Sequence, residues 1–177
     1  METTLNIQYG EIESPVGPLT ILKTEKGLCR IQFGSAEEHF PLIKAWLKKL
    51  GLKTDLVFNQ SAVEPIGKQI NEYFARERKS FDLPLDLFGT PFQKQVWEGL
   101  SNIPYGETYS YKDVATMIGS PKAVRAIGNA NNKNPVPIVI PCHRVIGSNG
   151  ALVGYGGGLD KKEVLLNLEQ QQTKICL

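Results

Sequence analysis

The first third of the chain alternates short apolar runs with turn residues. Runs rich in β-branched and apolar residues, bounded by Gly, Pro or charged turns, are typical of strands. Three strands are predicted, over Leu5–Glu13, Leu19–Lys23 and Leu28–Phe33. Because only short turns connect them, we expect an antiparallel meander.

Helical spacing follows the strands. Apolar residues recur every three or four positions over Leu42–Leu50 and again over Ile66–Phe74, which predicts two amphipathic helices. A polar, proline-containing stretch, Phe81–Gly89, then interrupts the pattern. We place a domain boundary in this stretch, which gives an N-terminal domain over 1–84 and a C-terminal domain over 85–177.

The second domain is predicted to be mainly helical. Thr90-Pro91 is typical of a helix start, and Ser110-x-x-Asp113 has the form of a capping box. The helix that Ser110 opens should close at Gly119, and Ser120-Pro121 should open the next one at once. Two short helices joined by a tight turn are typical of a helix-turn-helix, although helical hairpins also occur in unrelated folds.

The remaining pattern completes an α+β fold class. Pro135-Val136-Pro137 should stop the second short helix, and Ile138-Val139-Ile140 should form a short buried strand. Asp160-x-x-Glu163 should cap a final helix that runs through Glu169. The last residues, Gln170–Leu177, are expected to fray.

Charge is distributed unevenly along the chain. The net charge of +2 says little, but Val114–Leu159 contains no Asp or Glu. The cations of that window are Lys122, Arg125, Lys133 and Arg144. Such a window could face a polyanion such as DNA, or its charge could be balanced by acids elsewhere in the fold.

Cysteine usage favours a reducing compartment. The chain has three cysteines, Cys29, Cys142 and Cys176, and an odd number at wide spacing argues against a disulfide framework. The N-terminus lacks the basic and apolar segments of a signal peptide, and no apolar run is long enough to span a bilayer. We expect a cytoplasmic protein with no membrane partner.

The segment Ile138–Val145 carries the most informative chemistry. Cys142 follows an apolar run and a proline, and His143 and Arg144 come directly after it. A thiolate is the reactive form of cysteine, and nearby positive charge or a base lowers its pKa. A lone cysteine is more often buried and inert, but these two neighbours favour a nucleophile.

The motif Pro141-Cys142-His143-Arg144-Val145 resembles the active-site signature of the O6-alkylguanine-DNA alkyltransferases. The similarity covers Pro91 to Glu169, and the N-terminal third matches only in its strand-rich layout. The further motifs that match in order are Pro104–Glu107, Ser110-Tyr111, Gly119–Ala126, Asn134-Pro135 and Gly157–Leu159. The resemblance implies a ribonuclease H-like N-terminal domain and a winged-helix-like C-terminal domain.

The resemblance also implies an activity. A monomer would move the alkyl group from O6 of guanine in double-stranded DNA, or from O4 of thymine, to Cys142 in a single turnover. No cofactor would take part. His143 would act as the base through a bridging water, because adjacent side chains on extended backbone point to opposite faces. Glu169 would hold the histidine, Tyr111 would donate to the leaving guanine, and Asn134 would hold the active-site turn.

Other residues are implied in DNA and base binding. Arg125 would enter the duplex and fill the gap left by the flipped nucleotide, since a base inside the stack cannot be reached. The DNA contacts would include Lys122, Ala123, Ala126, Arg144 and Tyr111, and the base pocket would include Val145, Tyr155, Gly156 and Gly157. Gly156 departs from some relatives, which carry a hydroxyl there. Some relatives also bind zinc, but Cys29 and His39 are too few for a structural site, so no metal is expected.

Taken from the residues alone, three roles have simpler explanations. Glu169 could be a solvated helix charge, Tyr111 a packing residue and Arg125 a solvated cation. Two other function classes also stay open. A helix-turn-helix regulator without chemistry would explain the basic window but not the Cys142 motif. A cysteine hydrolase would need a separated histidine, and His143 is adjacent to the cysteine.

Overall fold

The computed structural model describes residues 4–175 and divides the chain into two compact units, Met1–Phe88 and Gly89–Leu177. The division lies four residues beyond the predicted 84/85 boundary. Residues 85–88 belong to the first unit because they bond and pack there: Leu85 forms a β-bridge with Leu28, and the ring of Phe88 packs against that of Trp46. The proline-containing stretch that suggested the boundary is therefore mostly part of the first unit.

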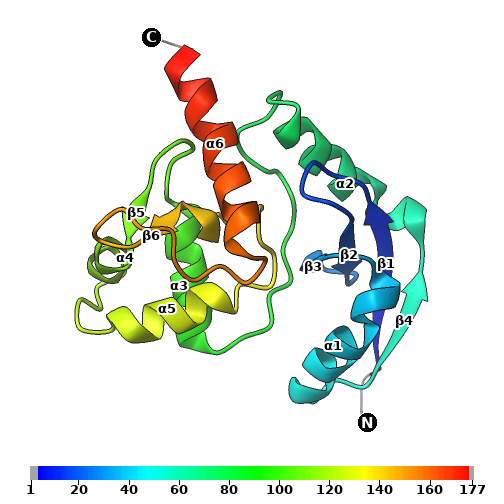
Figure 1. The fold of residues 1–177 in the computed structure, drawn as a ribbon. Coiled ribbons are helices and arrows are strands. Elements are labelled where there is room, and N and C mark those ends of the chain that lie inside the picture. The colour runs from blue at the N-terminus through cyan, green and yellow to red at the C-terminus, as the bar shows by residue number, and fades with distance from the viewer. Residues whose placement is uncertain (1–3, 176–177) are drawn as a thin grey trace. The chain divides into compact units, whose positions relative to one another are not determined.

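The first unit is built on a four-stranded sheet of order β3-β2-β1-β4 (Figure 1). The predicted antiparallel meander is confirmed: β1 spans Leu5–Ile12, β2 spans Leu19–Lys23 and β3 spans Leu28–Phe33. The sequence analysis missed β4, Thr54–Phe58, which pairs parallel to β1 at the edge of the sheet. No residue of β4 is fully buried, so the strand lacks the apolar alternation by which a strand is predicted.

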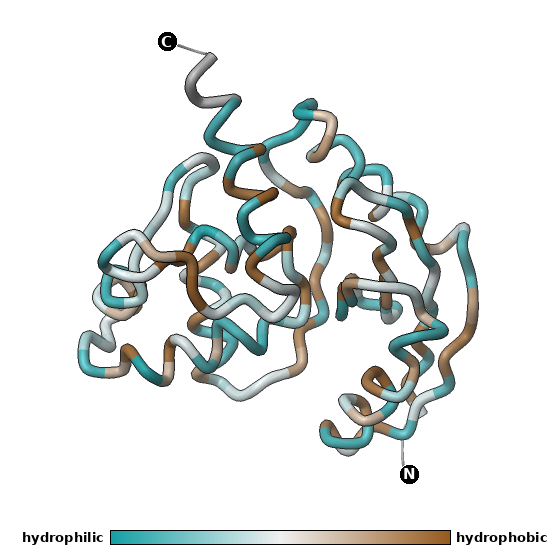
Figure 2. The backbone as a smooth tube through the Cα atoms, in the orientation of Figure 1, coloured by the Kyte–Doolittle hydropathy of each residue, from teal (hydrophilic) through white to brown (hydrophobic). Residues whose placement is uncertain are grey.

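Two helices cover opposite faces of this sheet. Alternate residues of a strand point to opposite sides, and Ile7 of β1 packs with Ile43 and Leu47 of α1, Ala36–Lys49. Gly10 of β1 faces the other way, where a Cβ atom would lie 2.4 Å from a methyl group of Val63 in α2, Gln60–Phe74. Figure 2 shows the apolar positions that recur along both helices, as their spacing predicted.

The second unit contains the helix-turn-helix, which α4 (Tyr111–Met117) and α5 (Val124–Asn132) form. The unit begins with α3 (Pro91–Ser101), which starts at a Thr90–Gln93 capping box. The helix α4 starts at a Ser110–Asp113 capping box, and both helix starts were predicted. The helix α5 packs against α3 and α4. The prediction that α5 opens at Ser120-Pro121 is wrong, because residues 120–123 form a turn and Ala123 is the N-cap.

Two further predictions in the second unit are corrected. Ile138-Val139-Ile140 is largely buried as expected but is not a strand, because Ile138 has φ of 76° and the segment turns back so that Ile140 forms an isolated bridge with Pro137. The last helix, α6, spans Leu159–Ile175 and so continues beyond Glu169. Most of the predicted frayed tail is therefore helical, and residues 176–177 lie outside the described part of the chain.

The remaining elements of the second unit are short. The strands β5 (Tyr109–Ser110) and β6 (Val145–Ile146) pair in parallel, and a single 3₁₀ turn, η1 (Cys142–Arg144), precedes β6 (Figure 1). The chain thus passes from the nucleophile motif directly into a strand beside the N-terminus of α4. Within residues 4–175, no helix is long and apolar enough to cross a membrane.

Candidate active site and DNA-binding surface

Cys142 lies in a turn that is held from both sides by Asn134. The Asn134 side chain donates from Nδ2 to the carbonyl of Ile140 at 2.8 Å and accepts from the backbone N–H of Val136 at 3.0 Å. Backbone bonds from Cys142 N to the Ile140 carbonyl (2.8 Å) and from Arg144 N to the Pro141 carbonyl (3.0 Å) close the turn. The prolines of this segment have no N–H to donate, so the segment cannot pair its backbone groups as a regular strand would. The Asn134 amide instead bonds the Ile140 carbonyl and the Val136 N–H. Asn134 therefore lies where a residue that holds the active-site turn must lie.

The Cys142 thiol is protonated in the resting protein. Its side chain is 4% exposed, and burial raises the pKa of the thiol to about 11. A hydrogen bond with the Asn134 side chain, the charge of Lys162 and the backbone N–H groups of Cys142 and His143 oppose that rise without overcoming it. The positive charge expected to lower this pKa is not that of the nearby Arg144. The charge that favours the thiolate belongs to Lys162.

His143, Arg144 and Glu169 form one buried cluster. His143 Nε2 lies 2.7 Å from Glu169 Oε1, while Arg144 donates from Nε to Oε2 and from Nη2 to Oε1, each at 2.9 Å. Burial by itself would raise the pKa of Glu169, but the hydrogen bonds and charges of the other two side chains outweigh it and lower the pKa to about 2. Glu169 is therefore an ionised buried carboxylate that binds the side chains of His143 and Arg144.

The imidazole of His143 is neutral at neutral pH. Burial lowers its pKa, and this effect outweighs the opposing hydrogen bond and charge of Glu169. Because Glu169 is ionised, the proton of the ring belongs on Nε2, which faces the carboxylate. Nδ1 is then an acceptor, and it is buried with no hydrogen-bond partner in the described part of the protein. The cluster thus presents an unprotonated nitrogen at the residue next to Cys142.

Arg144 is a structural cation, which corrects its expected role in DNA binding. Its side chain is 7% exposed, and the remaining donor Nη1 bonds the carbonyl of Ile103 at 2.6 Å. The guanidinium also lies over the ring of Tyr105, 5.6 Å from its centroid. The backbone after Cys142 is not extended as expected. It forms a 3₁₀ turn, which rotates successive side chains by about 120°, so both His143 and Arg144 reach Glu169.

Lys162 is a site residue that the sequence analysis missed. Its side chain is fully buried, and Nζ donates to the carbonyl of Val145 and, at 2.9 Å, to that of Val153. Burial lowers the pKa of Lys162 to about 8, although the Cys142 thiolate would raise it. The spacing of the residues in α6 could have predicted the burial of Lys162. Lys162 recurs at helical spacing with Leu165, Leu166 and Glu169, and all four lie on the buried face of α6. A lysine on an apolar stripe needs a partner, and here the partners are two carbonyls.

The loop after β6 brings the predicted base-pocket residues near Tyr111. The Tyr111 hydroxyl donates to the Val153 carbonyl at 3.2 Å, so this carbonyl serves both Tyr111 and Lys162. Burial raises the pKa of Tyr111, and the negative charge of a Cys142 thiolate would raise it further. Burial, then the charges of Cys142 and Glu169, also raises the pKa of Tyr155. Val145 is buried, and Gly156 and Gly157 follow in the same loop.

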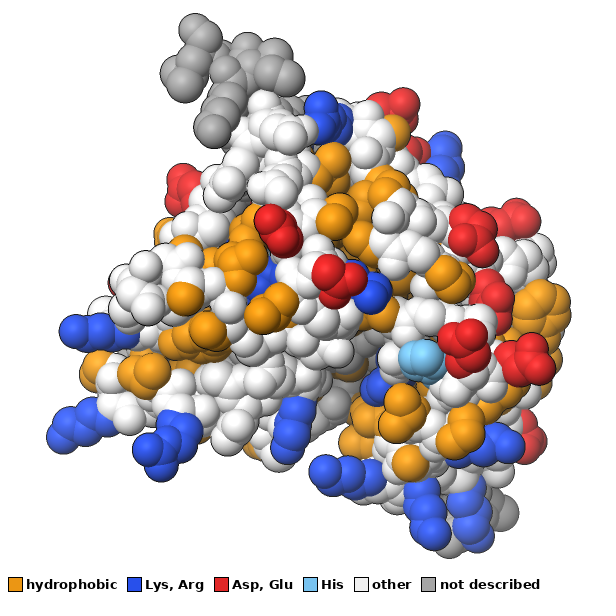
Figure 3. Space-filling model, in the orientation of Figure 1, with side chains coloured by type: hydrophobic (Ala, Val, Ile, Leu, Met, Phe, Trp, Pro, Cys, Tyr) orange, Lys and Arg blue, Asp and Glu red, His pale blue; other side chains and the backbone are white. Residues whose placement is uncertain are grey.

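The outer face of the helix-turn-helix carries the predicted DNA contacts. Lys122, Arg125 and Ala126 are exposed and Ala123 is half-buried, while Ile127 and Ala130 face the interior. Figure 3 shows Lys and Arg side chains along the edge where α4 and α5 lie. Small side chains beside an exposed arginine let this helix approach a nucleic-acid backbone closely.

From residue 4 to Phe88, the first unit shows no comparable cluster of reactive side chains. Cys29 is buried among apolar side chains and its Sγ donates to the Leu22 carbonyl, and burial raises the pKa of this thiol to about 12.

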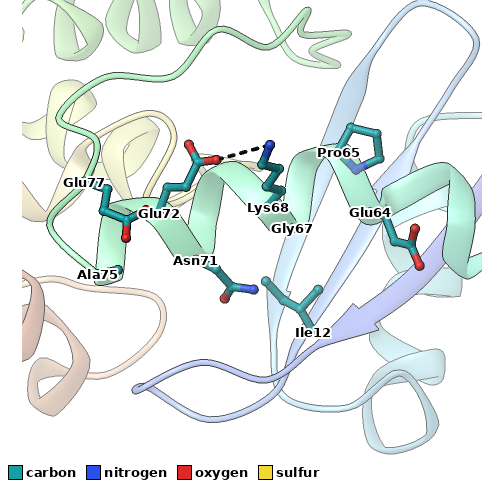
Figure 4. Close-up of a pocket in the computed structure, with 9 residues that line it drawn as sticks. All are labelled: Ile12, Glu64, Pro65, Gly67, Lys68, Asn71, Glu72, Ala75 and Glu77. Atoms are coloured by element: carbon teal, nitrogen blue, oxygen red, sulfur yellow. Dashed lines mark ion pairs between the residues drawn. The ribbon is translucent and has the colours of Figure 1, made fainter.

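The structure also has a surface pocket along α2, lined by Ile12, Glu64, Pro65, Gly67, Lys68, Asn71, Glu72, Ala75 and Glu77 (Figure 4). Lys68 pairs with Glu72 there at 3.8 Å, and the lining contains neither cysteine nor histidine. Among the described residues, no group of three His, Cys, Asp or Glu side chains could hold a metal ion.

The cluster makes a prediction about stability. Glu169→Gln should lower the free energy of unfolding at pH 7 by about 3–5 kcal/mol, because it leaves the buried Arg144 without a counterion. The folded-state pKa of about 2 lies below the ordinary 4.5, so this stabilisation is complete above pH 4.5 and is lost as the pH falls towards 2. Urea unfolding of the variant and the wild type at several pH values would measure both effects.

Glu163→Gln is the matched control, because Glu163 is exposed on the same helix. It should unfold like the wild type at every pH. A Glu169→Gln protein as stable as the wild type at pH 7, or a difference that persists unchanged towards pH 2, would contradict the assignment of Glu169.

Comparison with known proteins gives this geometry a context. Over 166 residues the chain is 45% identical to the methylated-DNA–protein-cysteine methyltransferase of Methanosarcina barkeri, covering 94% of this chain and 99% of that protein. It is 42% identical over 171 residues to the Mycolicibacterium paratuberculosis protein of the same name, with 97% of each chain covered.

Solved structures agree with these relatives. The crystal structure of Mycobacterium tuberculosis O6-methylguanine methyltransferase matches with a TM-score of 0.80 at 42% identity over 93% of both chains. The same organism's OGT in complex with DNA matches with a TM-score of 0.78 at 40% identity over 94% of both chains. The fold of each unit is therefore one already seen in that family.

Both units also match family profiles separately. Residues 7–87 match the ribonuclease-like domain of 6-O-methylguanine DNA methyltransferase, and residues 91–171 match the DNA-binding domain. The matched ranges contain nearly all of the sheet of the first unit and every site residue of the second. Sequence motif, site geometry and both domains thus agree, and the chain belongs to the 6-O-methylguanine DNA methyltransferase family.

Proposed function

We propose that the protein repairs DNA by moving an alkyl group from O6 of guanine to Sγ of Cys142. O4-alkylthymine is a second expected substrate. The observation that carries the proposal is a buried Cys142 thiol followed in the chain by a buried histidine. Nε2 of that His143 lies 2.7 Å from Oε1 of Glu169, which fixes its tautomer. This arrangement supplies a nucleophile and a base in a site that excludes bulk water. The relatives named for the same reaction and the neighbour bound to DNA support it.

The proton of the thiol must leave before sulfur can attack. With a pKa of about 11, Cys142 holds its proton at neutral pH, so transfer to Nδ1 of His143 across one bridging water would generate the thiolate. The imidazolium that forms is stabilised by the Glu169 carboxylate. Lys162 favours the thiolate as well, because its charge lies close enough to affect the pKa of Cys142.

The thiolate then displaces guanine from the alkyl carbon. A bond forms between sulfur and that carbon, the bond from carbon to O6 breaks, and its electron pair goes to the purine. Tyr111 would donate a hydrogen bond to the purine as this charge develops. Its hydroxyl now bonds the Val153 carbonyl, so it would exchange that acceptor for the base. The thioether product has no easy route back to a thiol, so each molecule would act once.

Binding and flipping of the nucleotide are assigned to α5. Arg125 is exposed near the N-terminus of that helix, where it would enter the duplex and occupy the space that the flipped base leaves. All the residues assigned to the chemistry come from the second unit of one chain, so we infer that the protein acts as a monomer. The reducing cytoplasm is the expected setting, since it keeps Cys142 a thiol.

The nucleophile is tested by mass. After incubation with duplex DNA that contains O6-methylguanine, the intact wild-type protein should gain one methylene equivalent, in a stoichiometric and not a catalytic yield. Cys142→Ser should gain nothing while still binding DNA, and Cys29→Ser should react like the wild type. Label on Cys29, or turnover beyond one equivalent, would refute the assignment. A helix-turn-helix regulator without chemistry would show DNA binding and no mass change.

The role of Arg125 is tested by comparing two substrates. Arg125→Ala should slow repair of duplex DNA far more than reaction with free O6-benzylguanine, because only the duplex requires flipping. Rates from quenched single-turnover reactions at fixed salt would measure this, since phosphate contacts make binding depend on salt. Lys44→Ala removes one exposed cation from the first unit and should affect neither rate. Equal slowing of both substrates by Arg125→Ala would exclude a role in flipping.

A further inference from the structure

Asn131 has a buried side-chain amide that no described residue satisfies. It lies in α5 and is 2% exposed, and neither its Oδ1 nor its Nδ2 has a hydrogen-bond partner. Its neighbour in sequence, Asn134, uses both ends of its own amide. An unmet buried amide costs folding free energy, and an apolar residue at this position would avoid that cost. The residue therefore calls for an explanation other than stability.

Helix geometry places Asn131 towards Tyr111. At about 100° per residue, Asn131 lies on the face of α5 between Ile127, which is fully buried, and Gly128. Gly128 faces the phenol ring, because a Cβ atom there would lie 3.9 Å from Tyr111 Cε1. Asn131 is thus on the inner face of the helix, on the side where Tyr111 lies.

Two other contacts place Asn131 near Cys142 and near the loop after β6. The backbone N–H of Asn134 bonds the Asn131 carbonyl at 3.3 Å, and the Asn134 side chain bonds the Cys142 thiol. On the other side, the carbonyl of Asn132 lies 3.5 Å from where a Cβ atom of Gly156 would be. The backbone at Asn131 and Asn132 is therefore in contact with Asn134 and close to the glycine loop. The Asn131 side chain lies on the inner face of α5 next to Gly128, which faces Tyr111. The nucleophile turn, Tyr111 and the glycine loop are the groups between which the alkylated base must sit if the proposed function is right.

We propose that Asn131 is a specificity-determining residue whose amide hydrogen-bonds the edge of the flipped alkylpurine. A carboxamide offers one acceptor and two donors, which matches the adjacent donors and acceptors on the edge of a purine. The unmet amide of the free protein is then satisfied by substrate. The unpaired amide lowers the stability of the free protein, but it makes binding of a base that can pair with Asn131 more favourable than binding of a base that cannot. This inference rests on the proposed function and adds a contact to the base.

The test separates base recognition from folding. Asn131→Leu keeps nearly the same shape and removes the amide, so the variant should melt at the same temperature as the wild type or higher. The substrate concentration for half-maximal single-turnover rate on O6-methylguanine duplex should rise about tenfold or more, the factor of a bidentate amide–base pair. Binding to undamaged duplex should not change. Asn167→Leu, at an exposed position of α6, is the matched control and should leave all three values unchanged.

Asn131→Ala serves as a second variant, since it also lacks the amide but cannot overfill the site. If either variant folds and reacts with wild-type concentration dependence, the inference is overturned. If both melt at a clearly lower temperature and lose undamaged-DNA binding as well, Asn131 is structural and the inference is overturned too. The wild type in the same reaction reports on the proposed function itself: no methyl gain there refutes that function, whereas a normal gain with unaffected variants refutes only the role of Asn131.

Discussion

One buried carboxylate determines the architecture of the site. Glu169, at the centre of α6, bonds His143 and Arg144 and lies 3.4 Å from the backbone N–H of Gly106. A buried anion is tolerated only when its lone pairs are matched by donors, and these donors come from segments that are distant in sequence. The same pairs that neutralise the charge therefore fix the last helix to the nucleophile turn and to the loop before β5.

This constraint separates the roles of two cations. Arg144 lies two residues after Cys142 in sequence, but its guanidinium neutralises the charge of Glu169 and donates to the carbonyl of Ile103. Lys162, distant in sequence, is the cation whose charge acts on Cys142. The thiol meanwhile keeps its proton, and since oxidation follows thiolate character, a protonated resting state protects a residue that can be used only once. The nucleophile would then be formed only when a base removes its proton inside the closed site.

Local signals predicted most of the fold. The meander of β1 to β3, the helix start at Thr90 and the capping box at Ser110 follow from patterns a few residues long, and they were predicted correctly. What was missed depends on distant contacts. The edge strand β4 exists because β1 pairs with it, and the boundary shifts because Leu85 pairs with Leu28. The segment Ile138–Ile140 has the composition of a strand, but its flanking prolines and the amide of Asn134 hold it as a turn.

The site was predicted through its motif, and its electrostatics were not. The resemblance implied that Arg144 would contact DNA, whereas the 3₁₀ turn directs its side chain inward. Lys162 could have been found from the spacing of α6, but its two carbonyl acceptors lie in segments whose positions only the folded chain defines. The sequence motif thus predicts a reactive residue, while burial and long-range pairing decide which of its neighbours are charged and where they point.

We propose that Glu169 fixes His143 as a neutral imidazole with its proton on Nε2, which leaves Nδ1 to accept the proton of Cys142. The ¹⁵N chemical shifts of the His143 ring at pH 7 distinguish the two neutral tautomers from the imidazolium. We expect a protonated Nε2 and an unprotonated Nδ1 in the wild type. An imidazolium, or a neutral ring with its proton on Nδ1, would show that Glu169 does not set this tautomer.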